Sequence, residues 1–333
     1  MMDTIKLSHG DGGIHTNELI KSVFLKNYGD EDNDGVSDSF VFSIDSSKLA
    51  YTTDSFVVRP LFFKGGDIGK LSICGTINDL VTAGAIPLYI SVGFIVEEEF
   101  EIESLCTIAK SMSDVCKKTG VKIVTGDTKV VEKGSADGVF INTSGIGIVS
   151  ELYRPCNIES GDEIIITGTI AQHGTAILID RYDLAVQTDI TSDCSPLNDL
   201  ILGLGEELKN IKLMKDPTRG GIATVLNEIV QSVDYNIELF ENKIPIDNQV
   251  KTVNEILGVD PLYLACEGRM VLVTKKGSGN KVLSRIKNLT NCKDAKIIGH
   301  FALEKNAMVY MNTQIGGKRI IPTLEGQTIP RIC

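Results

Sequence analysis

Short acidic motifs beside small turn residues are the part of this sequence best suited to chemistry. They are TTDS at 52–55, GD at 66–67, ND at 78–79, TGDTK at 125–129 and DPTRGG at 216–221. Magnesium binds a few carboxylates together with the oxygens of phosphates, so dispersed aspartates suit a metal–nucleotide site. Asp, Gly, Thr and Asn are also ordinary turn residues, and each motif taken singly fits a turn as well. Their recurrence favours a nucleotide site.

Glycine pairs precede two predicted helices, at Gly65-Gly66 and Gly220-Gly221. The first N–H groups of a helix are free and carry partial positive charge, so either loop could cradle a phosphate. The sequence contains neither the P-loop motif nor the protein-kinase motifs. An ATP site in this chain would therefore be of another type.

The tail ends in a cysteine, Cys333, which follows Pro330-Arg331-Ile332. None of the eight cysteines forms a C-x-x-C pair, so a zinc or iron–sulfur site is not indicated. The other seven lie in apolar segments and are expected to be small core residues. From Pro322 the tail could span roughly 35–40 Å when extended. We expect a carrier arm that another protein loads; the alternative is a terminal thiol without function.

Composition limits the classes of function. The chain has 333 residues and a formal net charge of -11, with no basic stripe of the kind that binds nucleic acid. No apolar run approaches the roughly 20 residues of a membrane-spanning helix. The first residues, MMDTIKLSHGDGG, do not resemble a signal peptide. We expect a cytoplasmic protein that binds neither nucleic acid nor a membrane.

Strand and helix patterns alternate along the chain and predict two α/β (α+β) layer domains. Strands are expected at 40–44, 49–53, 88–96, 121–125, 139–149, 163–167, 270–274 and 297–301, and helices at 17–27, 67–83, 102–116 and 222–233. We divide the chain into an N-terminal segment (1–35), a first domain (36–150), a second domain (155–321) and a flexible tail (322–333).

Several longer motifs together resemble the HypE family of carbamoyl dehydratases, which act in [NiFe]-hydrogenase maturation. They are HGDGG (9–13), TTDSFVVRPLFFKGGDIGKLSICGTINDL (52–80), VKIVTGDTKVV (121–131), FINTSGIG (140–147), SDCSPL (192–197), DPTRGGIATVLNE (216–228), PLYLACEG (261–268) and PRIC (330–333). The broader superfamily is that of aminoimidazole ribonucleotide synthetase, the PurM-like proteins. Its other members are similar in the acidic and glycine loops but lack the cysteine tail.

The resemblance implies a fold and a set of site residues. The first domain would be a mixed sheet that pairs in a homodimer to form a barrel-like core, and the second an α/β layer. ATP would lie between the domains, held partly through the dimer. The implied magnesium ligands are Asp38, Asp54, Asp79 and Asp127. The implied nucleotide-site residues are Thr53, Asp54, Asp67, Asn78, Asp79, Asp127, Asp216, Thr218 and Arg219.

The family reaction converts a carbamoyl group on the sulfur of Cys333 into a thiocyanate, which supplies the cyanide ligand of the hydrogenase iron. ATP phosphorylates the amide oxygen, and a base then removes the nitrogen protons. The resemblance assigns Lys129 and Glu267 to the reacting group. We expect Glu267 to be the base and Lys129 its electrostatic partner, because Lys129 would need a lowered pKa to act as base.

The implied partners are the carbamoyltransferase HypF and the HypC–HypD scaffold complex. Two other functions remain open at this point. A kinase or synthetase of the same superfamily, acting on a small metabolite, would explain the acidic loops but leave the cysteine tail unused. A non-catalytic, ATP-gated scaffold would use the tail only to dock a partner.

Overall fold

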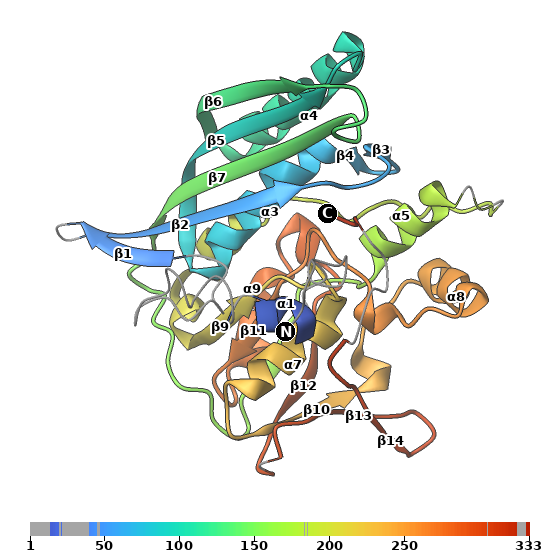
Figure 1. Ribbon diagram of the computed structural model, residues 1–333. Coiled ribbons are helices and arrows are strands. Elements are labelled where there is room, and N and C mark those ends of the chain that lie inside the picture. The colour runs from blue at the N-terminus through green and yellow to red at the C-terminus, as the bar shows by residue number, and fades with distance from the viewer. Residues whose placement is uncertain are drawn as a thin grey trace.

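The computed structural model describes residues 14–19, 21, 40–44, 47–182, 184, 186–304, 306–324 and 331–333. Within them the chain forms two layered halves, each built on its own sheet, as the sequence predicts (Figure 1). The glycine turn at 9–13, the predicted ligand Asp38 and part of the tail lie outside the described residues. Helix α1 (Ile14–Leu19) covers part of the helix expected at 17–27.

The first sheet has the strand order β1-β2-β7-β5-β6. Its strands are β1 (Phe40–Ile44), β2 (Ser47–Phe56), β5 (Ala85–Glu97), β6 (Lys122–Val131) and β7 (Val139–Val149). Neighbouring strands run antiparallel except for β5 and β6, which are parallel. Residues along β2 and β7 alternate between exposed and buried, the pattern of a sheet with one covered face. The short pair β3 (Phe62–Phe63) and β4 (Gly66–Asp67) follows β2.

Two helices cover the buried face of this sheet. Helix α3 (Ile68–Thr82) is buried along almost its whole length, because it lies between the first sheet and the second half of the molecule (Figure 1). Helix α4 (Ile102–Thr119) is amphipathic and buries Ile108, Met112 and Val115. It ends at Gly120, whose φ of 77° favours glycine.

The second sheet has the strand order β14-β13-β10-β12-β8-β11-β9. Its strands are β8 (Glu163–Ile166), β9 (Ile211–Lys215), β10 (Asn236–Phe240), β11 (Val271–Thr274), β12 (Lys296–Ala302), β13 (Val309–Asn312) and β14 (Lys318–Ile320). The central strands β8 and β11 are almost entirely buried. Strands β10 and β13 form the one parallel pair between described strands of this sheet.

Helices pack around the second sheet and complete its core. The α-helices are α5 (Gln172–Arg181), α6 (Asp199–Leu204), α7 (Gly221–Gln231), α8 (Asn248–Leu257) and α9 (Gly279–Ile286). Short 3-10 helices are η3 (Gly205–Asn210), η4 (Glu241–Lys243), η5 (Pro261–Tyr263) and η6 (Thr290–Cys292). None of the described helices combines the length and apolarity that crossing a membrane requires.

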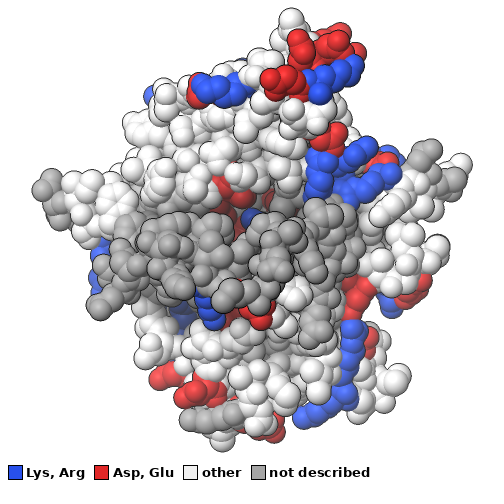
Figure 2. Space-filling model, in the orientation of Figure 1, with Lys and Arg blue, Asp and Glu red and all other residues white. Residues whose placement is uncertain are grey.

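Charged side chains on the visible side of the molecule are gathered in small groups. In Figure 2, Lys and Arg side chains lie in separate patches, and the area of the upper half below its charged upper rim is largely uncharged. Acidic side chains are visible near the middle, where the two halves meet. This junction therefore carries acidic side chains of the kind that a metal–nucleotide site requires.

Candidate functional site

Residues 331–333 lie between the two halves of the molecule, where the label C stands in Figure 1. The N–H groups of Val57 and Arg59 donate to the carbonyls of Cys333 and Arg331, both at 3.1 Å. The side chain of Ile332 is 8% exposed and belongs to the hydrophobic core. The described end of the tail is thus packed into the junction like an added strand.

The Cys333 thiol lies in a strongly charged setting. Burial raises its pKa to about 12, although Arg219 acts in the opposite direction. The carboxylates of Glu267, Asp54 and Asp216 also disfavour the thiolate. The thiol is therefore neutral at pH 7 in this position, and it does not resemble a self-activated nucleophile.

Asp54 and Asp79 line the same side of helix α3. Asp54 projects from β2 toward Gly75, where an added Cβ would lie 4.0 Å from its Oδ2. Asp79 follows Gly75 by one helical turn and accepts a hydrogen bond from Thr52 Oγ1 at 3.0 Å. Two predicted phosphate-site carboxylates are thus brought together by a strand and the helix that covers it.

Arg219 is the cation facing these acidic groups. Its Nη2 lies 3.6 Å from Asp54 Oδ1, and its side chain is 43% exposed. Interaction with Cys333, and then with Asp54, Asp79 and Glu267, raises the pKa of the guanidinium, which therefore stays charged. Arg219 interacts with residues from both halves and with the tail.

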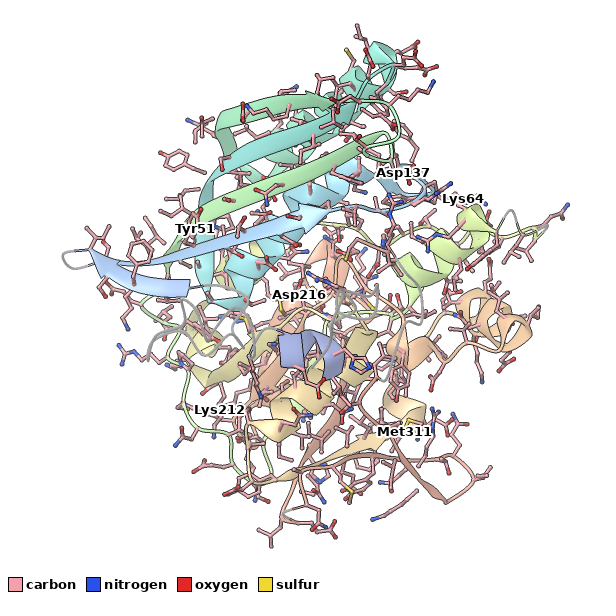
Figure 3. The ribbon with its side chains drawn as sticks, viewed as in Figure 1. Tyr51, Lys64, Asp137, Lys212, Asp216 and Met311 are labelled. Carbon is pink, nitrogen blue, oxygen red and sulfur yellow. The ribbon has the colours of Figure 1, made fainter. Side chains whose placement is uncertain are left out.

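Arg219 lies in the loop that opens helix α7. Asp216 is buried in this loop and lies at the centre of Figure 3, between the two halves. Thr218 is half-buried, and its carbonyl accepts a hydrogen bond from the N–H of Gly221 at 3.3 Å. Gly220 has a φ of 71° and Gly221 a φ of 60°, conformations that favour glycine. Among the described residues no side chain caps the helix there, so this N-terminus remains the better of the two predicted phosphate cradles.

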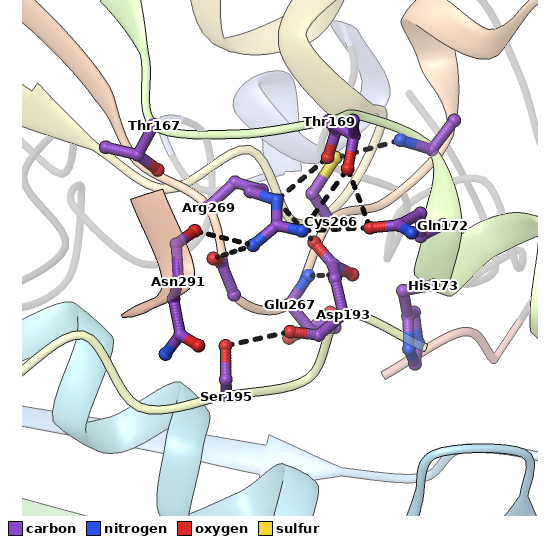
Figure 4. Close-up of polar contacts among 12 residues, drawn as sticks. Thr167, Thr169, Gln172, His173, Asp193, Ser195, Cys266, Glu267, Arg269 and Asn291 are labelled. Carbon is purple, nitrogen blue, oxygen red and sulfur yellow. Dashed lines mark hydrogen bonds and ion pairs between the residues drawn. The ribbon is translucent and has the colours of Figure 1, made fainter. Parts of the chain in front are cut away.

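Glu267 is held by its backbone on two sides. Its N–H donates to Asp193 Oδ1 at 3.2 Å, and its carbonyl accepts from Ser195 N at 3.4 Å. The adjacent Cys266 accepts a hydrogen bond at Sγ from the N–H of Ala171. Figure 4 shows this polar cluster, in which Arg269 also lies 3.5 Å from Asp193 Oδ2. The loop of Asp193 and the start of α5 therefore fix the backbone that carries Glu267.

The Glu267 carboxyl group is 2% exposed, and burial raises its pKa well above the ordinary value. Nearby Asp216, Asp193 and Asp54 raise the pKa further, while Arg219 lowers it. Its Oε1 makes no hydrogen bond within the part of the chain that the structure describes. A buried carboxyl with a shifted pKa and an unused oxygen, beside a cysteine, is the arrangement expected of a general acid or base.

Asn78 joins the two halves directly behind this group. Its Nδ2 donates to the carbonyls of Ser195 and Glu267, both at 3.2 Å, and its Oδ1 accepts from the N–H of Leu197 at 2.8 Å. Its amide is thus engaged with backbone groups of the second half. Asn78 positions Glu267 in this structure, and its predicted contact with a nucleotide stays a prediction.

Asp67 has a structural task at the start of α3. Its Oδ1 accepts from the N–H groups of Gly69 and Lys70 at 2.7 and 3.0 Å, and from Ser111 Oγ at 2.6 Å. These bonds occupy N–H groups that a phosphate would need, so the Gly65-Gly66 loop does not form the predicted cradle. A role for Asp67 itself at the nucleotide remains a prediction.

Asp127, Lys129 and Thr53 are separated from the junction. Lys129 Nζ lies 2.7 Å from Asp127 Oδ2, and both side chains are about 70% exposed. In the register of the sheet, Asp127 on β6 pairs with Gly93 on β5, and Gly93 pairs with the exposed Asn142 on β7. The side-chain amide of Asn142 donates to Thr53 Oγ1 on β2. These side chains therefore project from the face of the sheet opposite to Asp54. Within one protomer, the structure does not bring them together with Cys333 and Glu267.

Three residues that contact this site are not predicted by the sequence motifs taken one by one. His173 and Arg181, both on α5, donate to the tail carbonyls of Ile332 and Arg331, at 2.8 and 2.6 Å. Asp193 holds Glu267. The motif SDCSPL contains Asp193 and is the one available signal, whereas a single histidine in the first turn or a single arginine in the last turn of a helix gives no such signal.

Comparison with known proteins agrees with this geometry. The model of "AIR synthase related protein, N-terminal domain" matches residues 36–149, and that of "AIR synthase related protein, C-terminal domain" matches residues 159–311. The first match covers the first sheet, and the second match covers the second sheet except for the end of β13 and the edge strand β14. The fold is therefore the two-domain PurM-like fold.

Relatives of known name match along nearly the whole chain. Carbamoyl dehydratase HypE of Bradyrhizobium diazoefficiens is 41% identical over 99% of this chain and 96% of its own length. A crystal structure of a HypE–HypF complex matches with a TM-score of 0.87 and 44% identity, over 92% of this chain and 99% of the other. A structure of HypE in complex with ATP matches with a TM-score of 0.83 and 36% identity, over 99% and 100%. The chain therefore belongs to the carbamoyl dehydratase HypE family of hydrogenase maturation enzymes.

Proposed function

We propose that this enzyme uses ATP to dehydrate a carbamoyl group carried on the sulfur of Cys333, which yields a thiocyanate. The observation that best supports this proposal is that the end of the tail is hydrogen-bonded into the junction, where Cys333 interacts electrostatically with the buried Glu267 and with Arg219. A kinase acting on a small metabolite would have no use for a cysteine held in this position. The thiocyanate would supply the cyanide ligand of the [NiFe]-hydrogenase iron.

The reaction proceeds in two chemical stages. The carboxamide oxygen of S–CO–NH₂ attacks the γ-phosphorus of ATP, the bond to the leaving oxygen breaks, and ADP departs. The nitrogen then loses both protons, the C–O bond breaks with its electron pair on the departing phosphate, and a C≡N bond forms. The net change converts thiocarbamate and ATP into thiocyanate, ADP and phosphate.

Glu267 is the residue best suited to accept a nitrogen proton. A base works best when its pKa lies near the working pH, and burial among Asp216, Asp193 and Asp54 raises the pKa of Glu267 in that direction. Arg219 counteracts part of this rise. The anchoring of its backbone by Asn78 and Asp193 keeps the carboxyl group beside the tail.

The described acidic groups suit a magnesium ion that arrives with the nucleotide. No three described His, Cys, Asp or Glu side chains form a group that could hold a metal ion by themselves. Asp54 and Asp79 nevertheless lie on the same side of α3, and Mg²⁺ commonly takes only one or two carboxylates alongside phosphate oxygens. Bound there, Mg²⁺ would neutralise phosphate charge during phosphoryl transfer.

A homodimer would complete the site. One face of the first sheet is not covered by the described helices and is here called the open face. It carries apolar side chains whose exposed fractions lie between 36% and 46%, namely Tyr51, Ile86, Tyr89, Ile95 and Ile148. Such a face favours association. Asp127, Lys129 and Thr53 project from the same face, so pairing through it would bring these three residues to the partner. We assign the partner's Lys129 to the electrostatic role beside the reacting group.

The carbamoyl donor is a HypF-type carbamoyltransferase. A HypE–HypF complex matches this chain over 92% of its length, which supports a partner of that kind. A HypC–HypD-type scaffold would accept the cyanide. Transfer to either partner requires the Cys333 sulfur to leave its packed position.

Weighing the tail peptide tests the proposal. The enzyme is incubated with a HypF-type donor, carbamoyl phosphate and ATP, and the peptide that carries Cys333 is analysed by mass spectrometry. We expect the Cys333 peptide to gain a carbamoyl adduct and then to lose one water from it as ATP is consumed. The control is Cys333→Ala, which should bind ATP and gain no adduct. A stable adduct that ATP leaves unchanged would contradict the proposed activity.

A further inference from the structure

The last described residues of the chain are held by their backbone carbonyls. Besides the bonds from Val57 and Arg59, the carbonyl of Arg331 accepts from Arg181 Nη2 at 2.6 Å. The carbonyl of Ile332 accepts from His173 Nε2 at 2.8 Å. The bond from His173 therefore holds the residue directly before Cys333.

His173 is fully buried, and its ring has a defined partner on each nitrogen. The Ile332 carbonyl can only accept, so Nε2 carries the proton. Nδ1 then accepts from Ser192 Oγ at 2.8 Å, while Ser192 Oγ itself accepts from Cys194 N at 3.0 Å. Burial lowers the pKa of the imidazole, in keeping with this neutral form. Both ring nitrogens are thus engaged, one by the tail and one by the second domain.

The segment bonded to His173 also holds the proposed base. Asp193 follows Ser192 and accepts the N–H of Glu267 at 3.2 Å, and Ser195 N donates to the carbonyl of Glu267. Figure 4 shows His173 beside this cluster. One short stretch of chain, 192–195, therefore connects the anchor of the tail to the backbone of Glu267.

We propose that His173 is a positioning residue, which holds the Ile332 carbonyl and thereby sets the Cys333 sulfur against Glu267 and Arg219. This inference rests on the proposed chemistry at Cys333 and adds the residue that aligns its two reacting partners. Its two ring nitrogens are engaged by Ile332 and Ser192, so His173 is assigned no part in the bond-making steps. It acts through one hydrogen bond to the main chain of the tail.

Two substitutions separate the two sides of the ring. An Asn amide reaches the place of Nδ1, so His173→Asn keeps a partner for Ser192 and loses the donor to the tail. A Gln amide reaches the place of Nε2, so His173→Gln keeps the donor to Ile332 and loses the partner of Ser192. A role confined to supporting the 192–195 segment would make Gln the more harmful change. A role in holding the tail would make Asn the more harmful one.

Alkylation of cysteines by N-ethylmaleimide, followed by mass spectrometry of each peptide, measures how well the tail is held. Cys106 and Cys156 are exposed, so the expectation that they are core residues is wrong, and they serve as internal references in the same sample. We expect His173→Asn to accelerate the labelling of Cys333 by about tenfold, the usual effect of losing one buried hydrogen bond. His173→Gln should stay within about twofold of the wild type, and the reference cysteines should be unaffected in both.

Three outcomes would overturn the inference: an Asn variant labelled at the wild-type rate, equal acceleration in both variants, or acceleration in Gln alone. Labelling needs neither ATP nor a carbamoyl donor, so its result is independent of the proposed activity. If the activity proposal failed, the tail peptide would show no loss of water in the wild type, whatever the labelling rates. The two proposals can therefore fail separately.

Discussion

Glu267 makes the stability of the protein depend on pH in a direction that can be worked out. Its carboxyl pKa is raised by burial in the folded protein, whereas in the unfolded chain it is about 4.3. Between these two values the unfolded chain has released a proton that the folded protein keeps. The free energy of unfolding therefore falls as pH rises through this window.

We predict that Glu267→Gln removes this part of the pH dependence. As pH rises from about 4, the free energy of unfolding of the wild type should fall relative to that of the Gln variant. Denaturant unfolding at a series of pH values measures it. Glu255→Gln, at an exposed position on α8, is the matched control and should leave the profile unchanged. Parallel profiles for Glu267→Gln and the wild type would show that the folded protein does not retain this proton.

The same substitution should separate the two stages of the reaction. We predict that Glu267→Gln binds ATP and the carbamoylated tail but slows dehydration by about 10²–10⁴-fold, the usual contribution of a positioned base. Lys129→Met should also impair phosphoryl transfer, because it removes a positive charge. Single-turnover assays that follow ADP and thiocyanate separately distinguish the two. Normal thiocyanate formation by the Gln variant would exclude Glu267 as the base.

At the residue scale, the sequence motifs predict much of the chemistry but not its arrangement. Six of the predicted residues meet at the junction of the two halves, namely Asp54, Asp79, Asp216, Arg219, Glu267 and Cys333. The motifs do not predict that the Asn78 amide bonds to the backbone carbonyls of Ser195 and Glu267, because those residues are more than 100 positions away in the sequence. The contribution of His173 is hidden for the same reason.

Helix α3 provides a prediction at the scale of one element. Asp67 caps its first turn, so Asp67→Ala should lower the free energy of unfolding by about 1–2 kcal/mol. ATP affinity of the folded variant should be nearly unchanged. Thermal unfolding and calorimetric titration with Mg-ATP provide the two measurements. A loss of affinity without a loss of stability would instead support Asp67 as a nucleotide ligand.

Asp79, near the other end of α3, should behave in the opposite way. Asp79→Asn keeps the size of the side chain and an oxygen for Thr52, so the change in stability should stay within about 0.5 kcal/mol. Loss of its charge should weaken the binding of Mg-ATP. Wild-type affinity in calorimetric titration would remove Asp79 from the proposed phosphate site.

Tertiary pairing explains where the predicted elements and the structure differ. The TGDTK motif is expected at a strand end, but it lies inside β6, whose pairing with β5 extends to Val131. Gly126 is needed there, because an added Cβ would lie 2.6 Å from the carbonyl oxygen of Val92. Helix α5 is not predicted at all, since its N-cap residue is Ala171, which has a φ of 69° and a side chain that cannot accept a hydrogen bond. The apolar spacing along α4 is a local signal, and that helix is predicted well.

At the scale of the whole molecule, the open face predicts a homodimer. Its exposed apolar side chains and the edge strand β6 would be covered by a second copy. Light scattering at micromolar concentration should give about twice the 36.1 kDa of one chain. Tyr89→Lys, which places a charge on the open face, should shift the equilibrium toward monomer. A wild-type mass of one chain would contradict this arrangement.

Mixing two inactive variants tests whether Lys129 acts across the dimer. In a mixed dimer of Lys129→Met and Glu267→Gln protomers, one site would combine the native Glu267 of one chain with the native Lys129 of the other, and the second site would lack both. Random re-pairing of equal amounts makes half of the dimers mixed, so about a quarter of all sites would be intact. Thiocyanate formation should therefore recover to about a quarter of the wild-type rate.

The two variants assayed separately are the control for this recovery. Each homodimer lacks the same group in both of its sites, so neither should regain activity when it is unfolded and refolded alone. If Lys129 acted on the cysteine of its own chain, every site in the mixture would lack one of the two groups, and mixing would restore nothing. Since Lys129 and Asp127 project from the open face, away from Cys333 of the same chain, recovery on mixing is the expected result.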